Sequence, residues 1–166
     1  MSRTNQILIT VSLIIFSISP SFGDWKENAN AIDISGGENH TLVLTKNKTT
    51  WACGPNGDPV YSTYYGVLGT GSTNASLIAK TLIRVLGGNM GTEYLQDIND
   101  VEARWKHSLA LESYDPSDPN YNGYVWAWGW NGEGQLGDPE VGYATTPVQV
   151  LRGAQAPADT NTTTPF

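Results

Sequence analysis

The residues from Gly132 to Gly137 read GEGQLG, which matches the G-x-G-x-x-G pattern of dinucleotide-binding turns. In those turns a strand leads into the glycines and a helix follows, so that the helix N-terminus holds the pyrophosphate. The stretch Val125–Trp128 has the composition of a strand, but Asp138–Gly142 (DPEVG) cannot begin a helix with an apolar stripe. The acid at the ribose-binding distance, Asp159, lies in a tail rich in Thr, Pro and Ala. We therefore expect no cofactor, and the glycines need another explanation.

Metal-binding and nucleophilic side chains are sparse. His40 and His107 are the two histidines, and Cys53 is the one cysteine, so no disulfide can form within the chain. Cys53 has no histidine or second thiol near it in sequence, which predicts a small buried hydrophobic residue. The Asp and Asn side chains between Asp115 and Asn122 do not have EF-hand spacing, which favours a polar turn. We expect no metal site and no catalytic residue, so the protein is not expected to be an enzyme.

The first 23 residues have the organisation of a secretory signal peptide. Arg3 precedes an apolar run from Ile7 to Ile18, and small residues at Ser21 and Gly23 fit cleavage before Asp24. The run is shorter than the roughly 20 residues that a membrane-spanning helix needs. We expect a secreted, extracellular protein, periplasmic or at the cell surface in a bacterium, with no membrane span after cleavage.

The charge of the chain argues against nucleic acid as a partner. Its 9 basic residues include Arg3, so signal cleavage leaves 8 basic residues against 16 acidic ones. An acidic surface repels phosphate backbones, and no local cluster of Lys and Arg offsets the repulsion.

Four blocks of sequence occur twice in the same order. They are IDISGGENHTLVL (32–44) and INDVEARWKHSLAL (98–111), WACGPNG (51–57) and WAWGWNG (126–132), GVLG (66–69) and GQLG (134–137), and LIRVLGG (82–88) and PVQVLRG (147–153). The insertions that separate the copies fall between the blocks, as loops do on a retained scaffold.

Within each copy, apolar residues alternate with others at period two, as at His40, Leu42 and Leu44. About four such strands per copy, joined by hairpins, predict an all-β fold. Four-stranded antiparallel units repeated along a chain are typical of the blades of a β-propeller, of which two repeats are present.

The pattern of H-[ST]-L-x-L, [VT]-W-x-[CW]-G-x-N-G, G-x-L-G and then P-V-x-V, where the first copy has Leu82 in place of Pro147, closely resembles the repeat of the regulator of chromosome condensation family. The resemblance covers residues 32–153 and implies a propeller of seven blades. The copies depart from each other at Pro55, which stands where the second copy has Trp130, and at Ala103 and Arg104, which replace Gly36 and Gly37. These departures leave the register of each blade open.

We divide the chain into a signal peptide (1–23), a short lead (24–31), a first repeat (32–88), a spacer (89–97), a second repeat (98–153) and a Thr/Pro/Ala-rich tail or truncated spacer to a third repeat (154–166). Two repeats cannot close a ring and leave sheet edges and inner faces unpaired. We expect an N-terminal fragment of a longer propeller. The alternative is a complete two-repeat protein, which would have to self-associate.

Several recurring residues are expected to be structural. They are His40, Trp51, Gly54, Gly69, His107, Trp126, Gly129, Gly134 and Gly137. Each histidine should donate a hydrogen bond to backbone within its own blade, and the glycines should supply turns with positive φ. The tryptophans Trp51, Trp126 and Trp128 alternate with alanines, which predicts burial against the next blade.

The insertions are the candidate binding regions. Asp58–Tyr65 (DPVYSTYY) and Ser113–Tyr124 (SYDPSDPNYNGY) hold the six candidate partner-binding residues Tyr61, Tyr64, Tyr65, Tyr114, Tyr121 and Tyr124. Tyrosines on polar loops suit binding, because a stiff ring contributes contact area at small entropic cost. Successive turns of a meander alternate between the ends of a sheet, so the two loops should lie at opposite ends.

The leading hypothesis is a non-enzymatic secreted or surface propeller that binds an unidentified protein. A second hypothesis is binding of carbohydrate or cell wall through the tyrosine loops. The resemblance also implies guanine-nucleotide exchange with chromatin binding, which the signal peptide and the acidic charge disfavour, or inhibition of an extracellular enzyme. A fold alone does not choose among these roles.

Overall fold

The structure is a computed structural model that describes residues 30–58, 63–114, 117, 123–140 and 142–151. The expected signal peptide, most of the short lead and almost all of the C-terminal tail lie outside these residues. Within them, no helix has the length and apolar character needed to cross a membrane.

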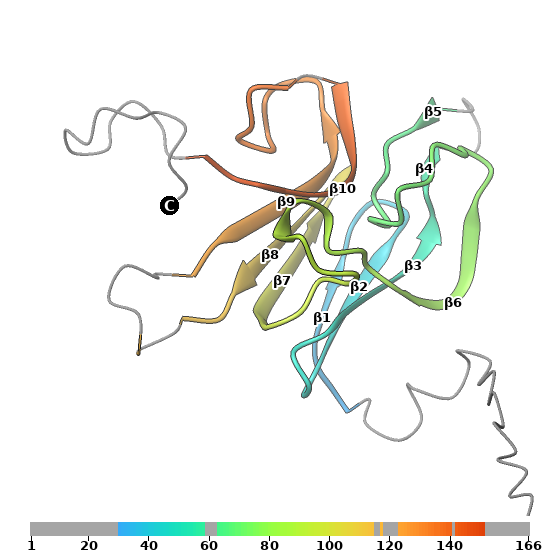
Figure 1. The fold of residues 1–166 in the computed structure, drawn as a ribbon. Coiled ribbons are helices and arrows are strands. Elements are labelled where there is room, and N and C mark those ends of the chain that lie inside the picture. Colours follow the sequence, from blue (N-terminus) through green and yellow to red (C-terminus); the bar gives the residue numbers. More distant parts are fainter. Residues whose placement is uncertain (1–29, 59–62, 115–116, 118–122, 141, 152–166) are drawn as a thin grey trace, which may run out of the picture.

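Two four-stranded antiparallel sheets make up the fold (Figure 1). Blade 1 has the strand order β1-β2-β3-β6, and blade 2 has the order β7-β8-β9-β10. The strands of blade 1 are β1 (Ala31–Gly36), β2 (Thr41–Thr45), β3 (Thr50–Pro55) and β6 (Ile78–Arg84). Those of blade 2 are β7 (Ile98–Arg104), β8 (His107–Glu112), β9 (Val125–Asn131) and β10 (Gly142–Gln149).

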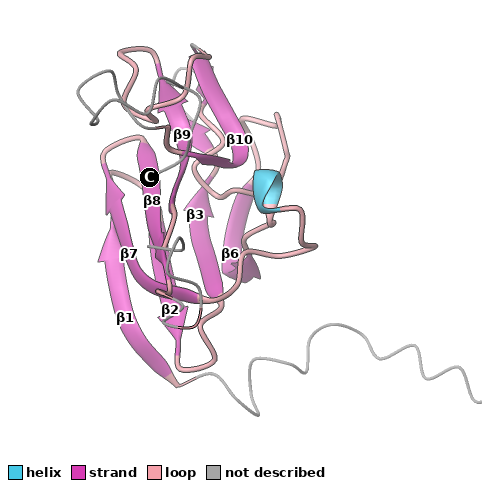
Figure 2. Cartoon of the chain, turned by 60° about the vertical axis from the view of Figure 1, so that its left-hand side comes forward, coloured by secondary structure: helices cyan, strands magenta, loops and turns pink. Residues whose placement is uncertain are grey.

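Two small elements accompany the blades. The first insertion contains a short hairpin of β4 (Gly57–Asp58) and β5 (Thr63–Tyr64). The 3-10 helix η1 (Gly88–Met90) is the only helical element among the described residues and is drawn in cyan in Figure 2. It follows blade 1 and packs against β10 of blade 2.

The pairing register shows that the two blades are built alike. In blade 1, Val43 pairs with Ile34 on one side and with Trp51 on the other. In blade 2, Ala110 pairs with Val101 and Trp126 in the same way. The first strand of each blade also shifts register at the corresponding place, between Ala31 and Asp33 and between Ile98 and Asp100. The structural repeat therefore begins at Ala31, one residue before the boundary predicted from sequence.

The core lies between the blades. Leu42, Leu44 and Ala52 of blade 1 are buried together with Val101, Ala103, Ala110, Trp126 and Trp128 of blade 2. Period-two alternation sends these side chains to one face of each sheet, so the residues between them point the other way.

Two expectations about this core were wrong. The tryptophans of blade 2 are buried against the preceding blade, because the face they share with Ala110 is turned toward blade 1. Trp51 occupies the equivalent position in blade 1 and is only half-buried. Cys53 shares its face and is also half-buried, not the buried residue expected from its type.

Two equivalent asparagines organise the loops that follow β3 and β9. Asn56 and Asn131 are both buried. Asn56 accepts from the Leu68 N–H through Oδ1 at 3.2 Å and donates from Nδ2 to the Ser72 carbonyl at 2.8 Å. Asn131 accepts from the Leu136 N–H at 2.9 Å in the same manner. Each amide thus holds the G-x-L-G turn of its own repeat.

Replacing Asn56 with alanine should lower the free energy of unfolding by about 2 kcal/mol, because it leaves the buried Leu68 N–H without an acceptor. Asn74→Ala is the matched control, since Asn74 accepts from the Ser76 N–H on an exposed loop and its loss should cost about 0.5 kcal/mol. Urea unfolding of both variants measures the difference. Equal losses would show that the buried amide has no special part in the loop.

Candidate functional site

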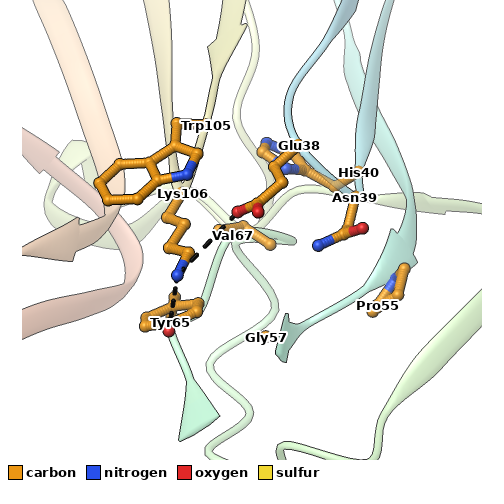
Figure 3. A pocket seen from close by; sticks show the side chains of 9 residues that line it. All are labelled: Glu38, Asn39, His40, Pro55, Gly57, Tyr65, Val67, Trp105 and Lys106. Atoms are coloured by element: carbon orange, nitrogen blue, oxygen red, sulfur yellow. Dashed lines mark hydrogen bonds and ion pairs between the residues drawn. The ribbon is translucent and has the colours of Figure 1, made fainter. Parts of the chain in front are cut away.

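A shallow pocket lies at one end of the molecule, where the two blades meet (Figure 3). The space between its walls, about 200 Å³, is open to solvent. The residues that line it are Glu38, Asn39, His40, Pro55, Gly57, Tyr65, Val67, Trp105 and Lys106. They come from the β1–β2 connection, the end of β3, the segment from β4 to the first G-x-L-G turn and the two-residue turn between β7 and β8.

The turn of Trp105 and Lys106 is fixed from both blades. The Glu38 N–H donates to the Trp105 carbonyl at 3.0 Å, and the Trp130 N–H donates to the Lys106 carbonyl at 2.8 Å. Trp105 has a φ of 45°, a conformation that side chains other than glycine seldom adopt and that is often found at functional sites. Its ring meets the ring of Trp130 edge-on, with 5.1 Å between centroids, yet 50% of its surface is exposed.

Lys106 stands between two aromatic rings. Its Nζ lies 4.7 Å from the ring centroid of Tyr65 and 4.8 Å from that of Trp105, and it donates to the Tyr65 hydroxyl at 3.0 Å. The Glu38 carboxylate is 4.0 Å away. The hydrogen bond to Tyr65 is the largest influence on the pKa of Lys106 and raises it, so the side chain is a cation throughout the physiological pH range. The rings favour that cation through their negative faces.

His40 closes the inner side of the pocket. Its Nε2 lies 2.9 Å from the Ser108 hydroxyl, which donates in turn to the Val67 carbonyl at 3.2 Å. Because the hydroxyl proton is used in that second bond, His40 must be the donor in the first. The Trp128 indole also donates to the Val67 carbonyl, at 2.9 Å.

This arrangement corrects the bond expected for His40, which does not stay within its own blade but joins blade 1 to blade 2. Burial, with a smaller contribution from the charge of His107, lowers the pKa of His40 to about 4. The imidazole is therefore neutral at physiological pH and has a bonded partner, which fits a structural role. Among the described residues, no group of three His, Cys, Asp or Glu side chains could hold a metal ion.

The structure separates the candidate tyrosines. Tyr65 lies at the pocket, whereas Tyr114 and Tyr124 lie at the opposite end of blade 2, beside the end of β8 and the start of β9. Tyr124 packs edge-on against Trp126, with 6.4 Å between ring centroids. Tyr61 and Tyr121 lie outside the described residues, as does the side chain of Tyr64. The described tyrosines of the two insertions therefore lie at opposite ends of the blades.

Sequence reasoning missed Trp105 and Lys106. The available signal was a tryptophan beside a lysine in a two-residue turn, where the first repeat has Glu38 and Asn39. Large aromatic residues are uncommon in tight hairpin turns, which prefer Gly, Asn and Asp.

The stretch GEGQLG is part of the connection from β9 to β10. Gly134 and Gly137 have φ values of 75° and 63°, and the Gly137 N–H donates to the Gly134 carbonyl at 3.1 Å. Gly66 and Gly69 form the same turn in the first repeat, with φ values of 76° and 65°. No helix follows either turn in the described residues, so the geometry of a phosphate-binding loop is absent there.

Comparison with known proteins identifies the repeat. Residues 122–159 match the model of the regulator of chromosome condensation (RCC1) repeat. The match begins just before β9 and includes β9 and β10, so the family's repeat is offset from the blade. No curated protein sequence matches the chain.

Three solved structures share the fold. Human WBSCR16 is 22% identical with a TM-score of 0.50, over 76% of this chain and 27% of that one. Yeast RCC1 (Prp20) bound to Kap60 is 18% identical with a TM-score of 0.51, over 78% and 26%. Saccharomyces cerevisiae Prp20p, studied for its binding to Gsp1p and histones, is 17% identical with a TM-score of 0.53, over 78% and 27%. This chain thus spans about a quarter of each of these proteins. They confirm the predicted propeller-type fold.

Proposed function

Because the chain carries the regulator of chromosome condensation repeat, folded as two propeller blades, we propose that it is a non-enzymatic protein-binding module. We propose further that the partner docks on the rim cluster, which we define as Tyr65, Trp105 and Lys106. The observation that carries the proposal is the exposed Trp105, held in place from both blades.

The rim cluster has the composition of an interaction hot spot. Tryptophan and tyrosine are among the residues through which protein interfaces gain most of their binding energy, and Lys106 adds a cation on an apolar stem beside them. A backbone hydrogen bond to the Trp105 carbonyl, a second to the carbonyl of Lys106 and the ring contact with Trp130 already hold Trp105 in place, so binding would not have to order it. Two of the solved structures of similar fold are of a protein studied with protein partners: Kap60 in one, Gsp1p and histones in the other.

The charge around the cluster indicates the kind of partner. Lys106 is a cation beside Glu38 on a chain with a net charge of −7. A partner surface with an apolar centre and polar groups of both signs would satisfy Trp105, Lys106 and Glu38 together. From the predicted signal peptide, we propose that the two proteins meet outside the cytoplasm.

Trp105→Ala should reduce capture of the partner by about 30-fold or more, the usual effect of removing a hot-spot tryptophan. Tyr114→Ala is the matched control, because Tyr114 is 57% exposed at the other end of blade 2 and should leave capture unchanged. The measurement is quantitative mass spectrometry of extracellular and cell-surface proteins bound by each immobilised variant.

Loss of capture by Tyr114→Ala alone would move the site to the opposite end of the blade. A glycan array run with the same variants tests the carbohydrate alternative. Sugar binding that disappears with Trp105→Ala would replace a protein by a glycan as the ligand of the rim cluster.

A further inference from the structure

A carboxylate stands beside the rim cluster. Glu38 lines the pocket, and its side chain is 41% exposed (Figure 3). Its nearest oxygen lies 4.0 Å from the ammonium of Lys106, which is an ion pair too long to be a hydrogen bond. The carboxylate oxygens therefore keep their capacity to accept hydrogen bonds from a donor that enters the pocket.

The charges around the pocket favour a cation as that donor. The hydrogen bond to Tyr65 raises the pKa of Lys106 most, and the charges of Glu38 and Asp58 raise it as well, so two carboxylates lie near one ammonium. His40 adds no charge, because burial lowers its pKa to about 4. A further anion would be repelled by this surplus of negative charge, and a further cation would be attracted.

The wall beside the carboxylate is aromatic. Half of the surface of Trp105 is exposed in the pocket, and the ring of Tyr65 lies on the other side of the Lys106 ammonium. A ligand that uses both the carboxylate and the indole needs a cationic group that tolerates contact with an aromatic surface. A guanidinium has this character, because it is planar and weakly hydrated, stacks on aromatic rings and donates two parallel hydrogen bonds to a carboxylate.

The backbone holds the carboxylate and the indole at a fixed spacing. The N–H of Glu38 donates to the carbonyl of Trp105 at 3.0 Å, so the two residues that would receive the ligand are bonded directly to each other across the two blades. A site whose parts are already in place loses less entropy when a ligand binds.

We propose that the partner enters the pocket with an arginine side chain, whose guanidinium packs on the indole of Trp105 and donates to the carboxylate of Glu38. This inference rests on the proposed function, because it names the side chain through which the docked protein contacts the rim cluster.

Lys106 has a definite effect on such a ligand. Its ammonium donates to the Tyr65 hydroxyl at 3.0 Å and competes for the charge of Glu38. Lys106→Met keeps an apolar stem between the rings and removes the competing charge. The variant should therefore bind an arginine more tightly than the wild type, whereas a ligand with a carboxylate would lose its counter-charge and bind more weakly.

Short peptides of known charge test the proposal on the full chain. The probes are acetylated and amidated pentapeptides of glycine with arginine, citrulline or glutamate at the centre. Citrulline has nearly the shape of arginine without its charge. NMR follows the indole N–H signal of Trp105, which the spectrum of Trp105→Phe assigns. The arginine peptide should shift this signal with a dissociation constant of about 1–10 mM and bind at least about fivefold more tightly than either other peptide.

Three variants locate the contact. Glu38→Gln should weaken binding of the arginine peptide about threefold to tenfold through the lost charge. Glu133→Gln is the matched control, because it removes the same charge from an exposed loop of the second repeat and should leave binding unchanged. Lys106→Met should strengthen binding about twofold to threefold. Circular dichroism checks that each variant is folded.

The outcomes separate this inference from the proposed function. An arginine peptide that shifts the Trp105 signal no more than the citrulline peptide does would overturn the inference, as would equal effects of Glu38→Gln and Glu133→Gln or weaker binding by folded Lys106→Met. Capture of a protein partner that still depends on Trp105 would then leave the proposed function standing with another contact. Arginine binding that depends on Glu38, together with capture that ignores Trp105→Ala, would retain the arginine site and contradict the docking of that protein at the rim cluster.

Discussion

Gly129→Ala is expected to lower the free energy of unfolding by about 3–5 kcal/mol. Gly129 has a φ of 100°, and a Cβ on its backbone would lie 2.6 Å from the Lys106 carbonyl oxygen and 2.8 Å from the Cα of His107. Both obstacles are backbone atoms of the neighbouring strand and turn, so they cannot move aside as a flexible side chain would. The turn that carries Trp105 and Lys106 should therefore be distorted as well.

Gly142→Ala separates the two causes of this loss. Gly142 has a φ of 109°, and nothing lies within 4 Å of a Cβ built on it. Its substitution carries the conformational penalty alone, about 1–2 kcal/mol. Gly54 is the equivalent of Gly129 in blade 1, where the Cβ would meet the Asn39 carbonyl, so Gly54→Ala should match Gly129→Ala. Urea denaturation measures all three, and equal losses at Gly129 and Gly142 would contradict the steric explanation.

Acid should destabilise the protein through His40. Its pKa is about 4 in the folded state, against about 6.5 when unfolded, so the unfolded chain binds the extra proton between these values. The stabilising effect of the neutral imidazole is complete above pH 6.5 and is lost as pH falls toward 4. The shift corresponds to about 3 kcal/mol of unfolding free energy.

His40→Gln should remove this pH dependence, because the glutamine amide can still donate to Ser108 but does not titrate. Urea unfolding at a series of pH values between 4 and 7 gives the slope for each protein. His107 contributes a smaller slope of the same sign, since burial and then Arg104 lower its pKa, so His107→Gln is the control. Asp138 gives a slope of the opposite sign. Burial raises the pKa of its carboxyl, so its contribution to the free energy of unfolding is present at low pH and is lost as pH rises above about 4. An unchanged slope in His40→Gln would exclude His40 as the cause.

The blades could be predicted because each is encoded within one repeat. Period-two alternation is a local property of a strand, so it can be read from the sequence at His40, Leu42 and Leu44. The same alternation recurs in the second copy at His107, Leu109 and Leu111, and this agreement supports the prediction. The role of the glycines in GEGQLG followed from the same comparison, because the first copy separates Gly57 and Gly66 by an insertion that a phosphate loop could not accept.

Contacts between blades could not be predicted in this way. The partner of His40 is Ser108, 68 residues away, and nothing in the local sequence states which of two neighbouring blades an imidazole faces. The direction of Trp128 was misjudged for the same reason, because alternation shows that a side chain lies on one face but not which neighbour covers that face. Trp105 was missed because a turn of two residues has no periodicity from which to infer its surroundings.

The bond between His40 and Ser108 has a consequence for how such a protein can grow in evolution. The histidine that donates and the hydroxyl that accepts are adjacent in the repeat, as His40–Thr41 and His107–Ser108, so one dipeptide encodes both halves of a contact between neighbours. A gene segment that is duplicated in tandem brings the donor and the acceptor with it. A newly duplicated blade can therefore form this hydrogen bond with the blade before it at once, and later selection only improves the packing between them.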